Sequence, residues 1–96
     1  MHELVKRPLA KADLRKIWRD TYKDWGLAQA DKYLREIGAA LQNLKENPRM
    51  GRERDEIREG YRSLVVRQHL IFYVVQDQKI SVRRVLYGRM DPDRHL

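Results

Sequence analysis

Residues 61–87 read YRSLVVRQHLIFYVVQDQKISVRRVLY, and this stretch decides the fold. Short apolar runs rich in valine, isoleucine and tyrosine are interrupted by polar residues, a pattern typical of strands joined by tight turns. We predict three antiparallel strands at Tyr61–Val66, His69–Val75 and Ile80–Tyr87. The link Gln76–Lys79 contains no glycine, so we expect a type I turn between the last two strands.

The middle strand of the three is apolar on both faces. Side chains alternate along a strand. Two apolar triplets therefore lie on opposite faces: Ile71, Tyr73 and Val75 on one, and Leu70, Phe72 and Val74 on the other. Such a strand is central and covered on both sides. Two helices can cover only one face, so we expect the sheet to curl over itself or a partner protein to cover the second triplet.

The third strand changes phase along its length. Ile80 and Val82 share one face, whereas Val85 and Tyr87 take the opposite phase. A β-bulge at Arg83–Arg84 would reconcile the two halves. The bulge would also turn one or both arginines outward.

The first half of the chain has helical spacing. A short strand at His2–Arg7 precedes Pro8, which fits the first turn of a helix because its missing N–H costs nothing there. Gly26 fits a left-handed conformation that ends this helix. The apolar face that the spacing predicts consists of Leu14, Ile17, Trp18, Tyr22 and Trp25.

A second helix follows at once, and Asn47–Pro48 stops it. The short link forces the two helices into an antiparallel hairpin with their apolar stripes facing each other. The second stripe consists of Ala30, Leu34, Ile37, Leu41 and Leu44. We expect the aromatic residues Trp18, Tyr22, Trp25 and Tyr33 in the core rather than on a base-stacking surface. Arg49–Gly60 reads as a connecting loop with room for one helical turn.

Length and composition limit the class of protein. A chain of 96 residues fits one domain, residues 1–96, because either half would be too small to fold alone. The absence of cysteine excludes disulfides and thiolate metal sites. No long apolar run indicates a signal peptide or membrane span, so we expect a cytoplasmic protein. The net charge of +7 favours an anionic partner: nucleic acid, an acidic protein or a membrane surface.

Four cations repeat at every fourth residue of the first predicted helix and form what we term the cationic stripe: Lys11, Arg15, Arg19 and Lys23. The stripe could dock phosphates or acidic side chains. Three nearby aspartates dilute its charge, and charge runs on helices usually face water. We therefore favour a solvated face.

His69, Tyr87 and the neighbouring arginines are residue types that RNA cleavage needs, because they can move protons and hold phosphate. Nothing in the spacing fixes the histidine or the tyrosine near the arginines, and both fit a packed strand end. Catalysis is the less favoured interpretation. A metal site is disfavoured as well, because His2, His69 and His95 are far apart and no carboxylate pair flanks them.

Six segments carry a family pattern in their order and spacing: AKADLRKIW, YKDWGLAQADKY, LKENPRMG, EGYRSLVV, HLIFYVV and RRVLYGRMD. Over nearly the whole chain they resemble the ParE-type toxins of bacterial toxin–antitoxin modules. The WG-x-x-QA step between the helices and the RVL-x-x-RMD ending are the most specific pieces.

The resemblance implies an α+β fold of the RelE/ParE type, with a short N-terminal strand, an antiparallel two-helix hairpin and a three-stranded antiparallel sheet. It implies a non-catalytic toxin, without cofactor or metal, that inhibits DNA gyrase and blocks replication. A cognate ParD-like antitoxin would neutralise it in a hetero-oligomer. No membrane association and no sequence-specific nucleic-acid binding are expected.

The chain departs from the family pattern at three positions. Arg7 stands where relatives often have a capping serine, Tyr87 where they usually have histidine, and Leu70 where they often have arginine. In the RNase branch that arginine helps to hold the phosphate, so Leu70 argues against cleavage. A ribosome-dependent mRNA endonuclease of RelE type remains the alternative function, and a degenerate module that only binds its antitoxin is a third.

Two sets of contact residues follow from these interpretations. The bulge and the turn between Gly88 and Pro92 should expose side chains suited to an interface hot spot. The gyrase-contact candidates are Arg83, Arg84, Tyr87, Arg89 and Met90. The antitoxin-contact candidates are Leu70, Phe72 and Val74 on the sheet and Arg15 and Arg19 on the first helix.

Overall fold

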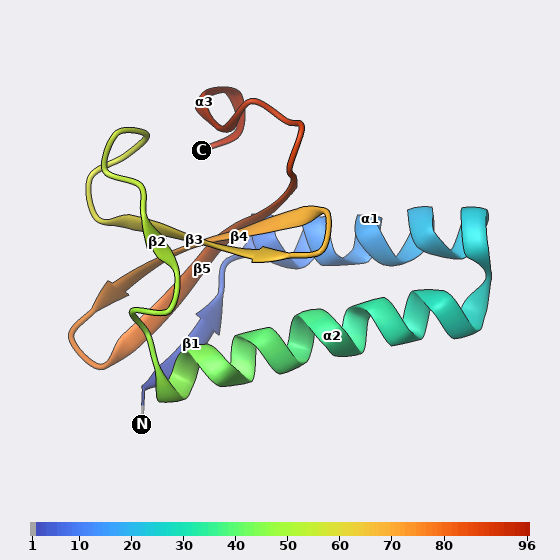
Figure 1. Ribbon diagram of the computed structural model, residues 1–96, viewed down its shortest axis with the longest axis horizontal. Coiled ribbons are helices and arrows are strands. Elements are labelled where there is room, and N and C mark those ends of the chain that lie inside the picture. Colours follow the sequence, from blue (N-terminus) through green and yellow to red (C-terminus); the bar gives the residue numbers. More distant parts are fainter. Residues whose placement is uncertain (1) are drawn as a thin grey trace.

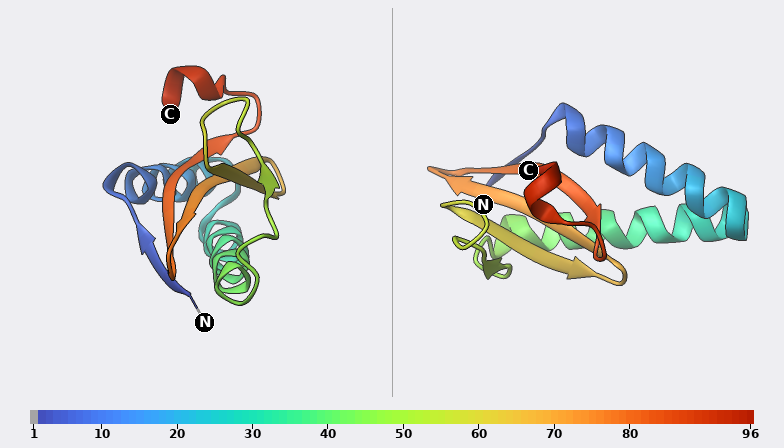
Figure 2. Two further views of the ribbon diagram at one scale, coloured as in Figure 1. Left: turned by 90° about the vertical axis from the view of Figure 1, so that its left-hand side faces the viewer. Right: turned by 90° about the horizontal axis from the view of Figure 1, so that it is seen from above.

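The computed structural model describes residues 2–96 (Figure 1). A helical hairpin packs on one side of a small sheet, and the C-terminal segment returns toward the other side (Figures 1 and 2). In chain order the elements are β1 (Glu3–Lys6), α1 (Pro8–Trp25), α2 (Leu27–Glu46), β2 (Arg52–Glu53), β3 (Tyr61–Val66), β4 (His69–Gln76), β5 (Lys79–Tyr87) and α3 (Pro92–His95).

The strands form one sheet in the order β1-β5-β4-β3-β2. β3, β4 and β5 are antiparallel neighbours, which confirms the predicted α+β class and its antiparallel unit. β1 lies parallel to β5, with Glu3 opposite Lys79 and Lys6 opposite Val82. β2 was not predicted, because two exposed residues carry no periodic signal.

The predicted bulge is confirmed. Phe72 pairs with Arg84 and Tyr73 pairs with Val82, so Arg83 is the extra residue. β5 therefore keeps Val82 and Val85 buried on either side of the slip.

The prediction of a type I turn between β4 and β5 is wrong. Gln76 pairs directly with Lys79, so only two residues form the loop. Asp77, the first of them, has a φ of +57°, whereas a type I turn has a negative φ there. Arg67 has a φ of +52° in the equivalent two-residue link between β3 and β4. Two-residue hairpins favour positive φ because it matches the twist of the strands.

A single glycine separates the two long helices. Gly26 has a φ of +91° and a ψ of 178°, and its N–H donates to Tyr22 O at 2.9 Å. The expected glycine ending is present, although this ψ lies outside the left-handed helical region. Pro8 starts α1, and Arg7 gives no side-chain cap.

The core lies between the hairpin and one face of the sheet. Ile71, Tyr73, Ile80 and Val82 are fully buried there against the stripe of α2. The buried residues of α2 are Ala30, Tyr33, Ile37, Leu41 and Leu44.

The prediction that all four helical aromatic residues lie in the core is wrong for the end of the hairpin. Tyr33 is buried, but Trp25 is 76% exposed and Tyr22 is 48% exposed. Trp18 is half-buried and stacks on Tyr22 with ring centroids 5.2 Å apart. The hairpin extends beyond the sheet, so no strand lies beneath its tip (Figure 1).

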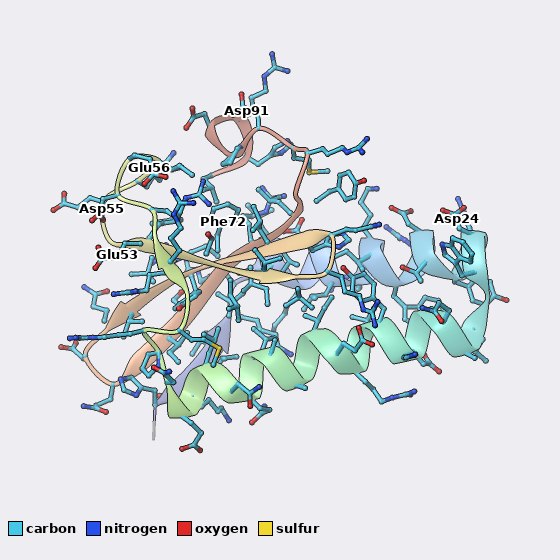
Figure 3. The ribbon with its side chains drawn as sticks, in the orientation of Figure 1. Asp24, Glu53, Asp55, Glu56, Phe72 and Asp91 are labelled. Atoms are coloured by element: carbon cyan, nitrogen blue, oxygen red, sulfur yellow. The ribbon has the colours of Figure 1, made fainter. Side chains whose placement is uncertain are left out.

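The second face of the sheet is covered partly by the chain itself. Phe72 is completely buried, and the guanidinium carbon of Arg54 lies 5.8 Å from its ring centroid. Figure 3 shows Phe72 beside the loop that carries Asp55 and Glu56. Arg58 of this loop also donates to Leu96 O, which ties the loop to the C-terminal segment. The expected external cover is therefore not needed over Phe72.

The loop 54–60 contains one helical turn, in which Arg58 N–H donates to Arg54 O at 3.1 Å. Gly60 N–H donates to the Asp55 carboxylate at 2.7 Å. This agrees with the predicted connecting loop.

Candidate functional site

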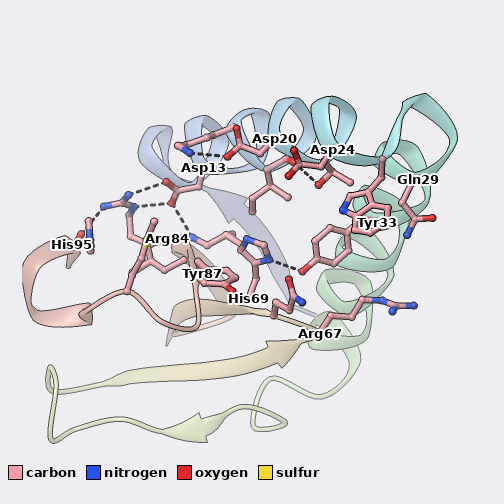
Figure 4. Close-up of a pocket in the computed structure, with 18 residues that line it drawn as sticks. Asp13, Asp20, Asp24, Gln29, Tyr33, Arg67, His69, Arg84, Tyr87 and His95 are labelled. Atoms are coloured by element: carbon pink, nitrogen blue, oxygen red, sulfur yellow. Dashed lines mark hydrogen bonds and ion pairs between the residues drawn. The ribbon is translucent and has the colours of Figure 1, made fainter.

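A cleft of about 770 Å³ opens between the overhanging hairpin and the end of the sheet (Figure 4). The tip of the hairpin forms one wall, and the link between β3 and β4 together with the end of β5 forms the other. Met90 and His95 of the C-terminal segment also line it. The cleft therefore gathers residues from α1, α2, the β3–β4 link, β4, β5 and the C-terminal segment.

Asp13 of α1 and Arg84 of β5 form the best-connected pair in the cleft. Arg84 donates to both carboxylate oxygens of Asp13, at 2.7 and 2.8 Å, and Val85 N–H donates to the same carboxylate at 2.9 Å. β1 pairs only with residues 79–82, so this end of β5 has no strand on its outer side. The carboxylate satisfies the edge N–H that a strand would otherwise bind, and it raises the pKa of Arg84.

The same arginine holds the C-terminal segment. Its Nη1 donates to His95 O at 2.6 Å. The side chain of Arg84 is only 17% exposed. The expectation that the bulge turns the arginines outward is therefore wrong for Arg84, because the negative charge on α1 draws its guanidinium inward. Arg83 is half-buried, and within residues 2–96 its Nε has no hydrogen-bond partner.

His69, Tyr33 and Tyr87 form an aromatic cluster beneath the hairpin tip (Figure 4). Tyr33 Oη lies 2.5 Å from His69 Nδ1 and donates to Val66 O at 3.1 Å. Since the hydroxyl has one proton, His69 Nδ1–H must be the donor to Tyr33. The ring of Tyr87 meets the imidazole edge-on at 5.7 Å.

Burial changes the proton affinities in this cluster. It lowers the pKa of His69, against a smaller opposite effect of Asp13 and Asp20, so the imidazole is neutral near pH 7. Burial also raises the pKa of Tyr33. A neutral imidazole beside phenols could accept a proton, as a nuclease requires.

The cations of the cleft are nevertheless engaged. Lys16 lies 2.7 Å from the Asp20 carboxylate, and Arg67 makes a two-pronged contact with Glu36 whose second hydrogen bond is 2.8 Å long. Arg84 is held by Asp13. A phosphate entering the cleft would have to compete with a carboxylate for each of its three cations.

Of the remaining gyrase-contact candidates, Tyr87 and Met90 line the cleft, and Arg89 directly precedes Met90. Arg89 and Met90 follow Gly88 in an exposed turn, as predicted, and Met90 is 39% exposed. Gly88 N–H donates to Gln68 O at 2.8 Å and Met90 N–H to Tyr87 O at 2.9 Å, which fixes the turn. Tyr87 is half-buried.

The antitoxin-contact candidates are dispersed. Phe72 is inaccessible, and Leu70 and Val74 are half-buried on the same face. Arg15 and Arg19 are exposed on α1, far from that face in sequence and topology.

Sequence reasoning missed Asp13 and Tyr33 as site residues. A signal for Asp13 was present, because it lies within about 40° of Ile17 around the helix, on the apolar side. An acid in that position needs a buried partner. No comparable signal marked Tyr33.

Among residues 2–96 there is no group of three histidine, cysteine, aspartate or glutamate side chains placed to hold a metal ion. In the same range, no helix has the length and apolar character that spanning a membrane requires.

The chain is similar to known toxins over most of its length. The family described as the ParE toxin of the type II toxin–antitoxin system, parDE, matches residues 4–92. Toxin ParE1 of Mycobacterium tuberculosis is 50% identical over 90 residues, covering 93% of this chain and 92% of its own. Toxin ParE1 of Caulobacter vibrioides is 38% identical over 87 residues, covering 91% and 90%.

A solved chain from the chromosomal ParDE system of Pseudomonas aeruginosa, described as "Chromosomal ParDE TA system from P. aeruginosa", has the same fold. It superposes with a TM-score of 0.80 at 22% identity, covering 91% of this chain and 96% of its own. The family match and the two toxins carry the assignment: this chain belongs to the ParE toxin family of type II toxin–antitoxin systems.

Proposed function

We propose that this toxin inhibits DNA gyrase without catalysing a reaction of its own, and that a cognate ParD-like antitoxin neutralises it in a hetero-oligomer. Membership of the ParE family supports the toxin–antitoxin role. Gyrase acts on DNA in the bacterial cytoplasm, so the toxin would act there. Neither a cofactor nor a metal is required.

One observation favours inhibition over RNA cleavage. Lys16, Arg67 and Arg84, the cations of the cleft, each face a carboxylate. Phosphoryl transfer needs a cation placed for the developing negative charge. A proton acceptor at His69 is a poor nuclease site when the cations that line its cleft are already bound to carboxylates.

The direct test uses purified gyrase and supercoiled plasmid. We expect the toxin to inhibit supercoiling and to accumulate double-strand breaks that depend on gyrase and ATP, and an excess of antitoxin should abolish both effects. Plasmid incubated with toxin alone is the control. Unchanged supercoiling at a tenfold excess of toxin over gyrase would exclude the proposed target.

The alternative, ribosome-dependent mRNA cleavage, is favoured by the meeting of His69 and Tyr87 in one cleft. Primer extension on transcripts bound to translating ribosomes tests it. We expect no toxin-dependent cuts. Cuts that disappear in His69→Ala or Tyr87→Phe would establish the RNase instead.

A further inference from the structure

Helix α1 carries its aspartates and Lys16 on the side of the cleft and the cationic stripe away from it. An α-helix advances about 100° per residue, so Asp13, Asp20 and Asp24 all lie within about 60° of the buried Ile17. Arg15 and Arg19 stand two residues before and after Ile17, about 160° away from it. The aspartates therefore turn toward the cleft, which all three line, and the arginines turn directly outward.

All four members of the cationic stripe are exposed. In the part of the chain that the structure describes, ion pairs join Lys16 to Asp20 and Arg84 to Asp13, and none involves a stripe residue. Two of the aspartates that seemed to dilute the stripe in the sequence, Asp13 and Asp20, are thus bound to other cations. Asp20 still lies near the stripe, because its pKa is lowered by Lys16 and, less strongly, by Lys23 and Arg19. Within residues 2–96 the stripe therefore carries four positive charges without an ion-pair partner.

The dimensions of the stripe suit a nucleic-acid backbone. Lys11 and Lys23 are twelve residues apart, about 18 Å along the helix axis. One strand of duplex DNA places a phosphate about every 3.4 Å along its axis, so roughly five phosphates fall within that length. Each member of the stripe is rotated by about 40° around the helix axis from the member before it. The two arginines therefore lie at the centre of the stripe, with one lysine on either side.

The composition of this face argues against a protein partner. Protein interfaces have an apolar core in which lysine is depleted, although arginine is enriched there. Half of the stripe is lysine. The outward face at Arg15 and Arg19 offers solvated cations, whose side chains can contact phosphates without reading sequence.

We infer that the cationic stripe of α1 binds the sugar–phosphate backbone of duplex DNA. Given the proposed function, that DNA is the segment held by gyrase, so the toxin would touch the enzyme through its C-terminal turn and the substrate through α1. The contact carries no sequence specificity. It also reassigns Arg15 and Arg19 from the antitoxin to DNA.

The test compares two double variants that each lower the net charge from +7 to +5. Arg15→Gln/Arg19→Gln removes the centre of the stripe. Lys32→Gln/Arg35→Gln removes two exposed cations of α2 that have no ion pair within residues 2–96. Binding to a fluorescent 20-base-pair duplex is measured by anisotropy between 50 and 200 mM salt, without gyrase, and a duplex RNA of equal length and a polyglutamate peptide serve as competitors.

Each phosphate contact contributes about 0.9 to the slope of log K against log salt concentration, so the stripe variant should flatten the slope by about 1.8. The α2 variant should leave the slope unchanged. Equal flattening in both variants, or none in either, overturns the inference, as does displacement of the DNA by tenfold less RNA or polyglutamate than unlabelled duplex.

Failure of the two proposals can be told apart. DNA binding with the predicted slopes but no effect on gyrase refutes only the proposed target. Gyrase inhibition that the stripe variant retains fully at 150 mM salt, together with unaltered DNA slopes, refutes only the role of the stripe.

Discussion

Asp13 on α1 and Arg84 on β5 are 71 residues apart in the sequence and form a two-pronged ion pair with both side chains mostly buried. The pair joins the hairpin to the sheet, closes the free edge of β5 and, through His95 O, holds the C-terminal segment. Arg84 therefore stabilises the fold, whether or not it also contacts a partner protein.

Asp13→Asn should therefore destabilise the fold. Removing one partner of a buried pair leaves the other charge uncompensated, and we expect a loss of about 3 kcal/mol in the free energy of unfolding. Asp20→Asn breaks the exposed pair with Lys16 and should change stability by roughly 0.5 kcal/mol or less. Urea denaturation measures both, and equal losses would refute a special role for Asp13.

The buried phenol of Tyr73 sits in a tight polar contact. Gly51 N–H donates to its hydroxyl at 2.8 Å, and the hydroxyl donates to Pro48 O at 2.7 Å. Tyr73→Phe should lose about 1–3 kcal/mol, because two buried groups are left unpaired. A Cβ at Gly51 would stand 2.4 Å from the phenol oxygen, so Gly51→Ala should cost about 1–3 kcal/mol by overpacking.

Gly38 provides the control for this pair of variants. It lies within α2, and a Cβ there would meet no atom within 4 Å. Gly38→Ala should stabilise the protein by about 0.5–1 kcal/mol. The melting temperature of Gly38→Ala should lie above that of the wild type, and those of Tyr73→Phe and Gly51→Ala should lie below it.

The stability of the fold should fall in mildly acidic solution because of His69. Burial lowers its pKa in the folded state, while the unfolded value is about 6.5. As the pH falls below that value the unfolded chain takes up the proton first, so the free energy of unfolding should decrease. Above the unfolded-state pKa, the contribution of neutral His69 to the free energy of unfolding is fully present.

Denaturation at pH values from 7.5 to 5.5 checks the His69 effect. His69→Gln should make the free energy of unfolding depend less on pH. His95→Gln is the matched histidine control and should leave that dependence unchanged. If His69→Gln retains the wild-type slope, another group is responsible. An NMR titration of the ring protons gives an independent reading of the direction.

Arg89 and Met90 are the gyrase-contact candidates that the fold leaves free. Arg89→Ala and Met90→Ala should each raise the toxin concentration needed for half-inhibition of gyrase at least tenfold, as expected of hot-spot residues. Because both are exposed, their melting temperatures should stay near wild type. Arg35 is an exposed arginine on α2, and Arg35→Ala is the control that should inhibit gyrase as the wild type does. If Arg89→Ala and Met90→Ala both inhibit gyrase fully, the contact lies elsewhere.

The antitoxin should bind the part of the outer sheet face that the chain leaves open. Val65 of β3 is 67% exposed and lies opposite the half-buried Leu70. Val65→Asp should weaken antitoxin binding at least tenfold in titration calorimetry, since a charge is placed in an apolar contact. Arg15→Gln/Arg19→Gln should bind the antitoxin within twofold of wild type; the reverse pattern would return those arginines to the antitoxin.

The sequence predicted most of the fold because apolar spacing dominates it. The three antiparallel strands, both long helices and the bulge at Arg83 all follow from which residues must face the core. The exposure of Trp25 could not be predicted, because the apolar spacing of a helix does not show how far the helix extends beyond the sheet. The self-covered Phe72 and the Asp13–Arg84 pair depend on contacts between segments far apart in the chain, which local patterns do not carry.

The parallel pairing of β1 with β5 also sets the order in which the molecule can be completed. Residues 3–6 pair with residues 79–82, which are synthesised much later. A ribosome adds about 5–20 residues per second, so β1 is synthesised several seconds before the strand with which it pairs. During that interval the nascent chain has neither the closed sheet nor the turn at residues 88–91. The sheet of this toxin therefore cannot close until most of the chain has been synthesised.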